Sequence, residues 1–228
     1  FMDQIKIRGG NRLEGTIKIS GSKNAALPLI TASLLTDKKI TIRRVPDLAD
    51  VKTISELLVH FGAELNIESA EEGKVLEICA RKIDKNEAPY ELVRKMRASV
   101  LVLGALIARC GEAKVSLPGG CAIGTRPIDI HLKGLESLGA EISLEDGYVK
   151  ALAPRGLVGT EIYFPKVSVG ATENLMMAAS LAKGTTTLFN SAKEPEITEL
   201  GNFLNKMGAR IQGLGTDRLL INGVRELN

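Results

Sequence analysis

A loop in the segment 117–131 of this 228-residue chain places a lone cysteine, Cys121, among glycines and prolines. That composition excludes a helix or a central strand, so we expect a loop of about ten residues. Buried structural cysteines usually lie on apolar helices or strands, which describes Cys79 and Cys110 but not Cys121. Arg126 and the N–H groups of the Gly-Gly turn would favour the thiolate. The loop therefore predicts a reactive thiol, and a tolerated loop cysteine is the alternative.

Two expected helix starts have a lysine beside them. Ser22 is expected to cap a helix that begins near Asn24, with Lys23 next to the cap. A cation is unfavourable at a helix N-terminus unless an anion binds there too. Lys166 lies close to Gly170, which precedes an apolar helix and marks a second start of this kind. Both patterns suit a bound anion, and the alternative is a lysine that is only solvated.

A third cationic segment opens an apolar stretch that we expect to form one helix from Glu91 to Arg109. Arg94, Lys95 and Arg97 fall in its first turns. Arg94 and Arg97 would share one face of the helix, because residues i and i+3 are neighbours on a helix surface. Such a pair suits an anionic ligand, and an ordinary solvated turn is the alternative.

An amphipathic helix that ends in Gly-Ala and leads into a strand occurs three times in the sequence. The closing glycines are Gly62, Gly139 and Gly208. A left-handed residue commonly follows the end of a helix, and glycine adopts that conformation without strain. An Ala/Leu-rich helical stretch and a short strand precede each copy, and a hairpin closes it. Each unit is therefore expected to run helix, strand, helix, strand, strand.

This repeat predicts an α/β (α+β) domain of three units with pseudo-threefold symmetry, in which sheets cover buried helices. We expect the units over residues 22–83, 84–155 and 156–226. Residues 1–21 read as strands that belong to a second domain, one of them over residues 15–19. Symmetry would bring the helix starts together in one cationic cleft suited to phosphate or carboxylate groups. Its expected cations are Lys23, Arg97, Arg126 and Lys166.

The composition narrows the classes of partner. Aromatic residues make up 4% of the chain, which argues against a base-stacking nucleic-acid surface. The net charge of +3 is too small to imply nucleic acid or a membrane surface, and no apolar run is long enough to span a bilayer. Scattered cysteines and only two histidines suit a reducing cytoplasm and offer no zinc-binding spacing. We therefore expect a cytoplasmic protein with no cofactor and no metal.

Four motifs resemble those of the UDP-N-acetylglucosamine 1-carboxyvinyltransferases, also called UDP-N-acetylglucosamine enolpyruvyl transferases. They are Ser20-Gly-Ser-Lys-Asn-Ala-Ala-Leu-Pro, Met96-Arg-Ala-Ser, the Cys121 loop from Leu117 to His131, and Ser168-Val-Gly-Ala-Thr-Glu-Asn. The resemblance follows the whole chain in order, and the cysteine loop is highly specific. One departure is Leu101, at a helix position where some members of the family carry Trp.

The resemblance implies that the enolpyruvyl group of phosphoenolpyruvate is transferred to the 3-hydroxyl of UDP-N-acetylglucosamine and phosphate is released, in the first committed step of peptidoglycan synthesis. It implies that Lys23, Arg97 and Arg126 hold phosphoenolpyruvate. Cys121 would be the catalytic thiol that fosfomycin alkylates. The implied sugar-nucleotide site consists of Asn24, Arg97, Pro127, Ile128, Asp129, His131, Lys166, Ser168, Val169 and Gly170.

Members of this family have two domains of three repeats each, with the active site between them. The resemblance therefore implies that this chain is the N-terminal half, that the missing C-terminal domain is its partner, and that the half alone is inactive. Two other interpretations stay open. One is a non-catalytic module that binds anions or nucleotides. The other is an enzyme like the 5-enolpyruvylshikimate-3-phosphate synthases, which share the fold but not the cysteine loop.

Overall fold

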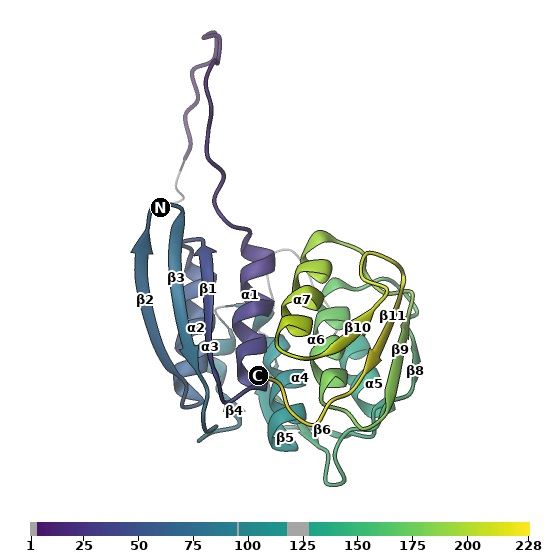
Figure 1. The fold of residues 1–228 in the computed structure, drawn as a ribbon. Helices are drawn as coiled ribbons and strands as arrows, with labels where there is room; N and C mark the ends of the chain where they lie inside the picture. The colour runs from purple at the N-terminus through teal and green to yellow at the C-terminus, as the bar shows by residue number, and fades with distance from the viewer. Residues whose placement is uncertain (1–3, 95, 118–127) are drawn as a thin grey trace.

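The computed structural model describes residues 4–94, 96–117 and 128–228, apart from the side chain of Arg97. Its first unit packs helices against a three-stranded antiparallel sheet of order β1-β3-β2 (Figure 1). The elements of this unit are α1 (Lys23–Ala32), the 3-10 helix η1 (Ser33–Leu35), β1 (Lys39–Val45), α2 (Ala49–His60), β2 (Glu64–Ala70) and β3 (Gly73–Cys79).

The second and third units each have a four-stranded sheet, because a parallel strand is added ahead of the first helix. The second sheet has the order β4-β5-β7-β6 and the third β10-β11-β9-β8, with β4 parallel to β5 and β8 parallel to β9. The second unit contains β4 (Glu87–Ala88), α3 (Tyr90–Val93), η2 (Arg97–Val100), α4 (Leu101–Cys110), β5 (Glu112–Ser116), α5 (Asp129–Ser137), β6 (Glu141–Glu145) and β7 (Tyr148–Leu152). The third contains β8 (Glu161–Tyr163), α6 (Val169–Ser180), β9 (Thr185–Phe189), α7 (Pro195–Lys206), β10 (Arg210–Gln212) and β11 (Arg218–Asn222).

The first helices of the three units, α1, α4 and α6, form the centre of the domain, and the sheets lie outside them (Figure 1). All residues of α6 from Ala171 to Ser180 are buried, as are those of α4 from Leu101 to Ile107. A helix buried on every side has to be enclosed by other elements. The predicted architecture, with sheets covering buried helices, is therefore confirmed. Within the described residues, no helix combines the length and the apolar character needed to cross a membrane.

The Gly-Ala pair closes the second helix of each unit in the same way. Gly62, Gly139 and Gly208 have φ values of 105°, 93° and 103°. The N–H of the alanine that follows each glycine donates to a carbonyl five residues back, at 3.0 Å in all three copies. This bond is the long one of a Schellman motif and satisfies a carbonyl that the helix end leaves without a partner. The three alanines are buried, so a small residue is needed there.

The helix expected from Glu91 to Arg109 is not continuous, and that prediction was wrong. It is divided into α3, η2 and α4, and Met96 between them is extended, with φ −149° and ψ 124°. The break buries Met96 and leaves Arg94 exposed and paired with Glu91, Nε to Oε2, at 2.9 Å. Burial of the apolar Met96 side chain favours this break. Arg94 and Arg97 therefore do not share one helix face.

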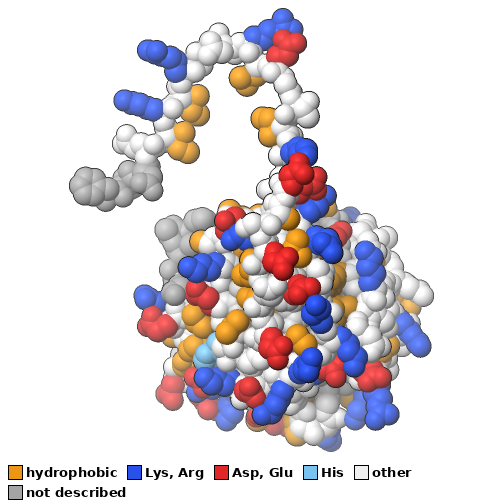
Figure 2. All heavy atoms as spheres, turned by 60° about the vertical axis from the view of Figure 1, so that its left-hand side comes forward, with side chains coloured by type: hydrophobic (Ala, Val, Ile, Leu, Met, Phe, Trp, Pro, Cys, Tyr) orange, Lys and Arg blue, Asp and Glu red, His pale blue; other side chains and the backbone are white. Residues whose placement is uncertain are grey.

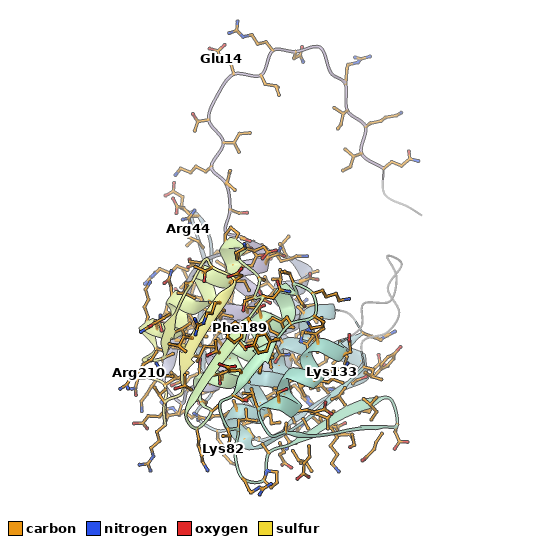
Figure 3. All side chains as sticks on the ribbon, turned by 90° about the vertical axis from the view of Figure 1, so that its right-hand side faces the viewer. Glu14, Arg44, Lys82, Lys133, Phe189 and Arg210 are labelled. Carbon is orange, nitrogen blue, oxygen red and sulfur yellow. The ribbon has the colours of Figure 1, made fainter. Side chains whose placement is uncertain are left out.

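The strand expected over residues 15–19 does not form in this structure, because no described strand pairs with it. A strand without a partner leaves its backbone groups unpaired and is not stable by itself. Residues 4–19 extend away from the domain in an arch, with Glu14 far from the sheets (Figure 3). The arch exposes five large aliphatic side chains between charged residues (Figure 2). They are Ile5, Ile7, Leu13, Ile17 and Ile19.

Candidate functional site

Helix starts from all three units meet at one cavity of about 240 Å³. The first unit contributes the start of α1, the second contributes η2 and the start of α4, and the third contributes the starts of α6 and α7. The residues that line the cavity are Asn24, Leu27, Pro28, Ala98, Leu101, Val169, Glu173 and Glu196. The helix starts of the three units thus meet as expected from the repeat, but none of the four expected cations is among the described residues of the lining. Leu101, where some relatives of the predicted family carry Trp, is part of this wall.

Lys23 is the first residue of α1, directly after its cap. The Ser22 hydroxyl accepts a hydrogen bond from the N–H of Ala25 at 3.4 Å, which confirms the predicted cap. The Lys23 ammonium pairs with the Asp50 carboxylate at 2.9 Å, and both side chains are partly exposed. Asp50 thus offsets the unfavourable position of a cation at a helix start. Exposed ion pairs contribute only about 0–1 kcal/mol, so an anionic ligand can compete for Lys23 at small cost.

Asn24 connects the first unit to the third. Its side-chain nitrogen donates to Oε1 of Glu196, on α7, over 3.4 Å. One amide hydrogen is thereby directed to α7, while the carbonyl oxygen and the other hydrogen stay available to a ligand. Sequence reasoning missed Glu196, because nothing local shows that α7 reaches the start of α1.

Glu173 is the second acidic residue in the cavity wall that sequence reasoning missed. Its side chain lies on α6 and is 5% exposed. The pKa of Glu173 is raised from 4.5 to about 8, mainly by burial and in addition by the nearby Glu196 and Glu194 carboxylates. At neutral pH this carboxyl group is therefore mostly protonated and can donate a hydrogen bond. The available signal was an acidic residue at the start of an otherwise apolar helical run.

His131 lies on α5 and is buried against α6. Its Nδ1 is 3.0 Å from the side-chain nitrogen of Asn174. Burial lowers the pKa of His131 from 6.5 to about 4, although the nearby Asp129 carboxylate opposes this effect. A Cβ added to Gly170 would lie 3.3 Å from Cε1 of the ring, which is closer than most real contacts. Glycine at position 170 therefore allows the neutral ring to approach the start of α6.

The start of α6 has the features of an anion site. The Ser168 hydroxyl accepts from the N–H of Ala171 at 3.3 Å and caps the helix. Val169 and Gly170 form the first turn and are half-buried, and Lys166 is exposed just ahead of them. The N–H groups of a first turn have no partner within their own helix, and the helix dipole favours negative charge there.

The remaining predicted residues divide into two groups. Ile128 is half-buried directly before α5, and Asp129 is exposed in its first turn. Cys121, Arg126 and Pro127 lie outside the described residues, as does the side chain of Arg97. The reactive thiol and the cationic character of the site therefore stay predictions.

The two described cysteines fit incidental roles. Cys79 is buried, and its thiol lies 3.6 Å from the carbonyl oxygen of Asp37. Cys110 is exposed, and partial burial of the thiol raises its pKa. A raised pKa leaves little of the nucleophilic thiolate at neutral pH. Among the described residues, no cluster of three or more His, Cys, Asp or Glu side chains is arranged to hold a metal ion.

Comparison with known proteins assigns the chain to a family. The family model described as EPSP synthase (3-phosphoshikimate 1-carboxyvinyltransferase) matches residues 7–228. This chain belongs to the EPSP synthase family. Solved structures of the family agree in fold. The enolpyruvyl transferase NikO from Streptomyces tendae has a TM-score of 0.79 at 24% identity over 95% of this chain and 50% of its own. An EPSP synthase from Acinetobacter baumannii has a TM-score of 0.72 at 19% identity over 93% of this chain and 48% of its own.

Two similar curated sequences share one name. A UDP-N-acetylglucosamine 1-carboxyvinyltransferase of Rhodospirillum centenum is 58% identical over 97% of this chain and 53% of its own length. A protein of the same name from Acidiphilium cryptum is 57% identical over 100% of this chain and 53% of its own length. The predicted resemblance is confirmed. This member of the family spans about half the length of the curated relatives that it matches.

Proposed function

We propose that this chain is the N-terminal half of a cytoplasmic enzyme that transfers the enolpyruvyl group of phosphoenolpyruvate to the 3-hydroxyl of UDP-N-acetylglucosamine. Phosphate is the other product, and the reaction begins peptidoglycan synthesis. The observation that carries the proposal is the 58% identity to a UDP-N-acetylglucosamine 1-carboxyvinyltransferase over 97% of the chain. The geometry supports it, because helix starts from all three units meet at one cavity.

Phosphoenolpyruvate would bind beside this cavity, whose described lining contains two glutamates and no lysine or arginine. Lys23 adjoins the cavity residue Asn24, and Arg97 adjoins the cavity residue Ala98. Together with Arg126 they would bind the phosphate and carboxylate of phosphoenolpyruvate. Cys121, from the same loop as Arg126, would be the thiol that adds to phosphoenolpyruvate, acts in proton transfer or product release, and is alkylated by fosfomycin.

UDP-N-acetylglucosamine would bind across α1, α5 and α6. The amide of Asn24 would contact the sugar, since Glu196 fixes only part of it. The diphosphate would accept hydrogen bonds from the first turn of α6, with Lys166 and Ser168 beside Val169 and Gly170. The rest of the nucleotide site would be residues Pro127, Ile128, Asp129 and His131.

The reaction would run by addition and then elimination. A base takes the proton of the 3-hydroxyl as a new bond forms between the sugar 3-oxygen and C2 of phosphoenolpyruvate, and C3 takes up a proton, which gives a tetrahedral intermediate. C3 then loses a proton, and phosphate leaves from C2 to restore the double bond. Fixed cations stabilise the charge that moves during these steps. The C-terminal domain would provide the acidic general base, so we expect this half alone to be inactive.

Complementation between two halves tests this proposal. The chain is mixed with the separately produced remaining part of the Rhodospirillum centenum relative, and phosphate release is measured with phosphoenolpyruvate and UDP-N-acetylglucosamine. Release is expected only when both halves are present. Shikimate 3-phosphate replaces the sugar-nucleotide in a parallel assay. Release with shikimate 3-phosphate alone would show that the chain belongs to a shikimate-pathway enzyme instead.

Cysteine variants separate catalysis from simple binding. Cys121→Ala is expected to abolish both phosphate release and time-dependent labelling by fosfomycin in the complemented mixture. Cys110→Ala is the matched control and should leave both unchanged, because Cys110 lies away from the cavity lining. Labelling of Cys121 no faster than that of Cys110 would instead indicate a non-catalytic anion-binding or nucleotide-binding module.

A further inference from the structure

Asn174 joins three helical segments at the centre of the domain. It belongs to α6 and is completely buried. Its side-chain nitrogen donates to the carbonyl oxygen of Val100, on η2, at 3.0 Å. The same nitrogen is 3.0 Å from Nδ1 of His131, on α5. One amide group therefore links the start of α6 to the second unit at two points.

The orientation of this amide follows from the Val100 carbonyl. A carbonyl oxygen only accepts hydrogen bonds, so the Asn174 nitrogen and not its oxygen must face Val100. The second hydrogen of that nitrogen then faces His131, and Nδ1 of the ring must accept it. A neutral imidazole that accepts at Nδ1 carries its proton on Nε2.

The amide oxygen of Asn174 lies on the other side, against α4. It is buried with no hydrogen-bond partner among the described residues. A Cβ added to Gly104 would lie 2.0 Å from this oxygen, so glycine at position 104 makes the room for it. A buried acceptor without a partner costs about 1–3 kcal/mol. The orientation in which the two N–H groups of Asn174 face Val100 and His131 therefore leaves the amide oxygen without a partner among the described residues.

The opposite nitrogen of His131 reaches the start of α6. Asn174 is the ring's hydrogen-bond partner among the described residues, and it occupies Nδ1. A Cβ added to Gly170, in the first turn of α6, would be 3.5 Å from Nε2. The ring is 7% exposed, so Nε2 is buried beside the first turn of α6, whose backbone N–H groups suit an anion.

We propose that Asn174 is a positioning residue, which holds His131 as the Nε2–H tautomer so that the ring donates a hydrogen bond to an anionic ligand at the start of α6. The identity of that ligand as the diphosphate of UDP-N-acetylglucosamine rests on the proposed function. The tautomer does not rest on it, because it follows from Val100, Asn174 and His131 alone.

The tautomer is measured in the chain itself. The sequence has two histidines, so long-range ¹H–¹⁵N spectra of a ¹⁵N-histidine sample contain only two rings. His131 is expected to show a protonated Nε2 and an unprotonated Nδ1 at pH 7. His60 serves as an internal reference, because its Nε2 faces the carbonyl oxygen of Glu87 at 3.1 Å and must carry a proton. A protonated Nδ1 in His131 would overturn the proposal.

A pair of variants tests the cause. In Asn174→Asp the side chain keeps its shape, and once ionised it can only accept, so spectra recorded from pH 7 to pH 9 are expected to show Nδ1 of His131 becoming protonated. Asn205→Asp is the matched control, since Asn205 is also a helical asparagine bonded to backbone, at Ile211, and should leave the His131 spectrum unchanged. A folded Asn174→Asp chain with the parental His131 spectrum would contradict the assigned role. If that variant does not fold, the spectrum of the parent still decides the tautomer.

The ligand is tested in the complemented mixture, with ¹⁵N-histidine only in this half. UDP-N-acetylglucosamine is expected to shift the Nε2–H resonance of His131, and uridine, which lacks phosphate, is not. If the same sample releases phosphate and the resonance does not move, the contact with the ligand is refuted. If the mixture releases no phosphate, the proposed function is contradicted. The tautomer of His131 is still decided by the spectrum of the chain alone.

Discussion

Glu173 should make the stability of the chain fall as the pH rises from 4.5 to about 8. Its pKa is raised from 4.5 to about 8, mainly by burial, so the folded chain retains a proton that the unfolded chain has lost. The stability linked to this proton is fully present below pH 4.5 and is lost as the pH rises through about 8. Each unit of pKa difference corresponds to about 1.4 kcal/mol.

Glu173→Gln should remove this loss, because glutamine has nearly the same shape and no charge. We expect its Tm to exceed that of the parent by at least about 2 °C at pH 9, since 1 kcal/mol moves the Tm of a chain this size by about 2–4 °C. At pH 5 the two should agree closely. Thermal melting at both pH values measures the effect, with the exposed Glu136→Gln as control. Equal melting of Glu173→Gln and parent at pH 9 would contradict the burial of a protonated carboxyl.

His131 should make the stability of the folded chain fall as the pH is lowered, which is the opposite of the effect of Glu173. Its pKa is lowered to about 4, so the unfolded chain takes up a proton before the folded one does. The stability linked to the neutral ring is present above pH 6.5 and is lost as the pH falls through about 4.

We therefore expect His131→Gln to lose less stability than the parent between pH 7 and pH 4.5, although it starts lower at pH 7 because a packed ring is removed. Urea titrations at the two pH values measure both quantities. His60→Gln is the matched control and should keep the parent's acid loss. A parallel fall in stability for parent and His131→Gln would show that the ring does not carry this dependence.

At the scale of the element, the three Gly-Ala helix ends offer a matched set of substitutions. Gly208→Ala should destabilise the chain by about 1–2 kcal/mol, which is the cost of a left-handed conformation for alanine, since nothing lies within 4 Å of the added Cβ. Gly62→Ala should cost more, because its Cβ would lie 2.8 Å from the Asp84 carboxylate. Denaturant unfolding of the two variants measures the order. Equal losses would show that the contact with Asp84 has no effect.

Most of the regular elements could be predicted from local signals. The cap at Ser22 and the glycines that end the helices act through their own backbone neighbourhood, so the sequence alone displays them. The break at Met96 could not be predicted, because no proline or glycine marks it and its cause is the burial of one side chain beside three cations. Residues 15–19 were expected to form a strand from their sequence, but a strand also needs a neighbouring strand to pair with.

The candidate site could be predicted only where its residues lie on such local signals. Lys23, Asn24 and the start of α6 were found because they stand next to caps and glycines. Asp50, Glu173, Asn174 and Glu196 were missed, since each acts on a residue from another element. Their roles depend on how the three units pack, which a single sequence does not display.

At the scale of the whole molecule, the N-terminal arch tests the assignment of residues 1–21 to a second domain. Trypsin should cut the isolated chain first within residues 4–18, where basic residues lie in an exposed segment without helix or strand. The rest of the domain should stay intact. Mass spectrometry over a time course identifies the cuts. Addition of the complementary half should slow these tryptic cuts at least tenfold. Unchanged cutting in a mixture that releases phosphate would contradict the assignment of residues 1–21 to the second domain.

The three Gly-Ala helix ends also suggest how such a domain can arise. Each copy ends its helix with the same bond, and the buried alanine occupies little space. A gene duplication would therefore yield units that already fit around a common axis, without new residues at the points where they join. Later divergence could then concentrate on the helix starts. This agrees with a chain in which the ends of α2, α5 and α7 have stayed alike, while the starts of α1, α4 and α6 carry a lysine, a methionine–arginine break and a capped glycine turn.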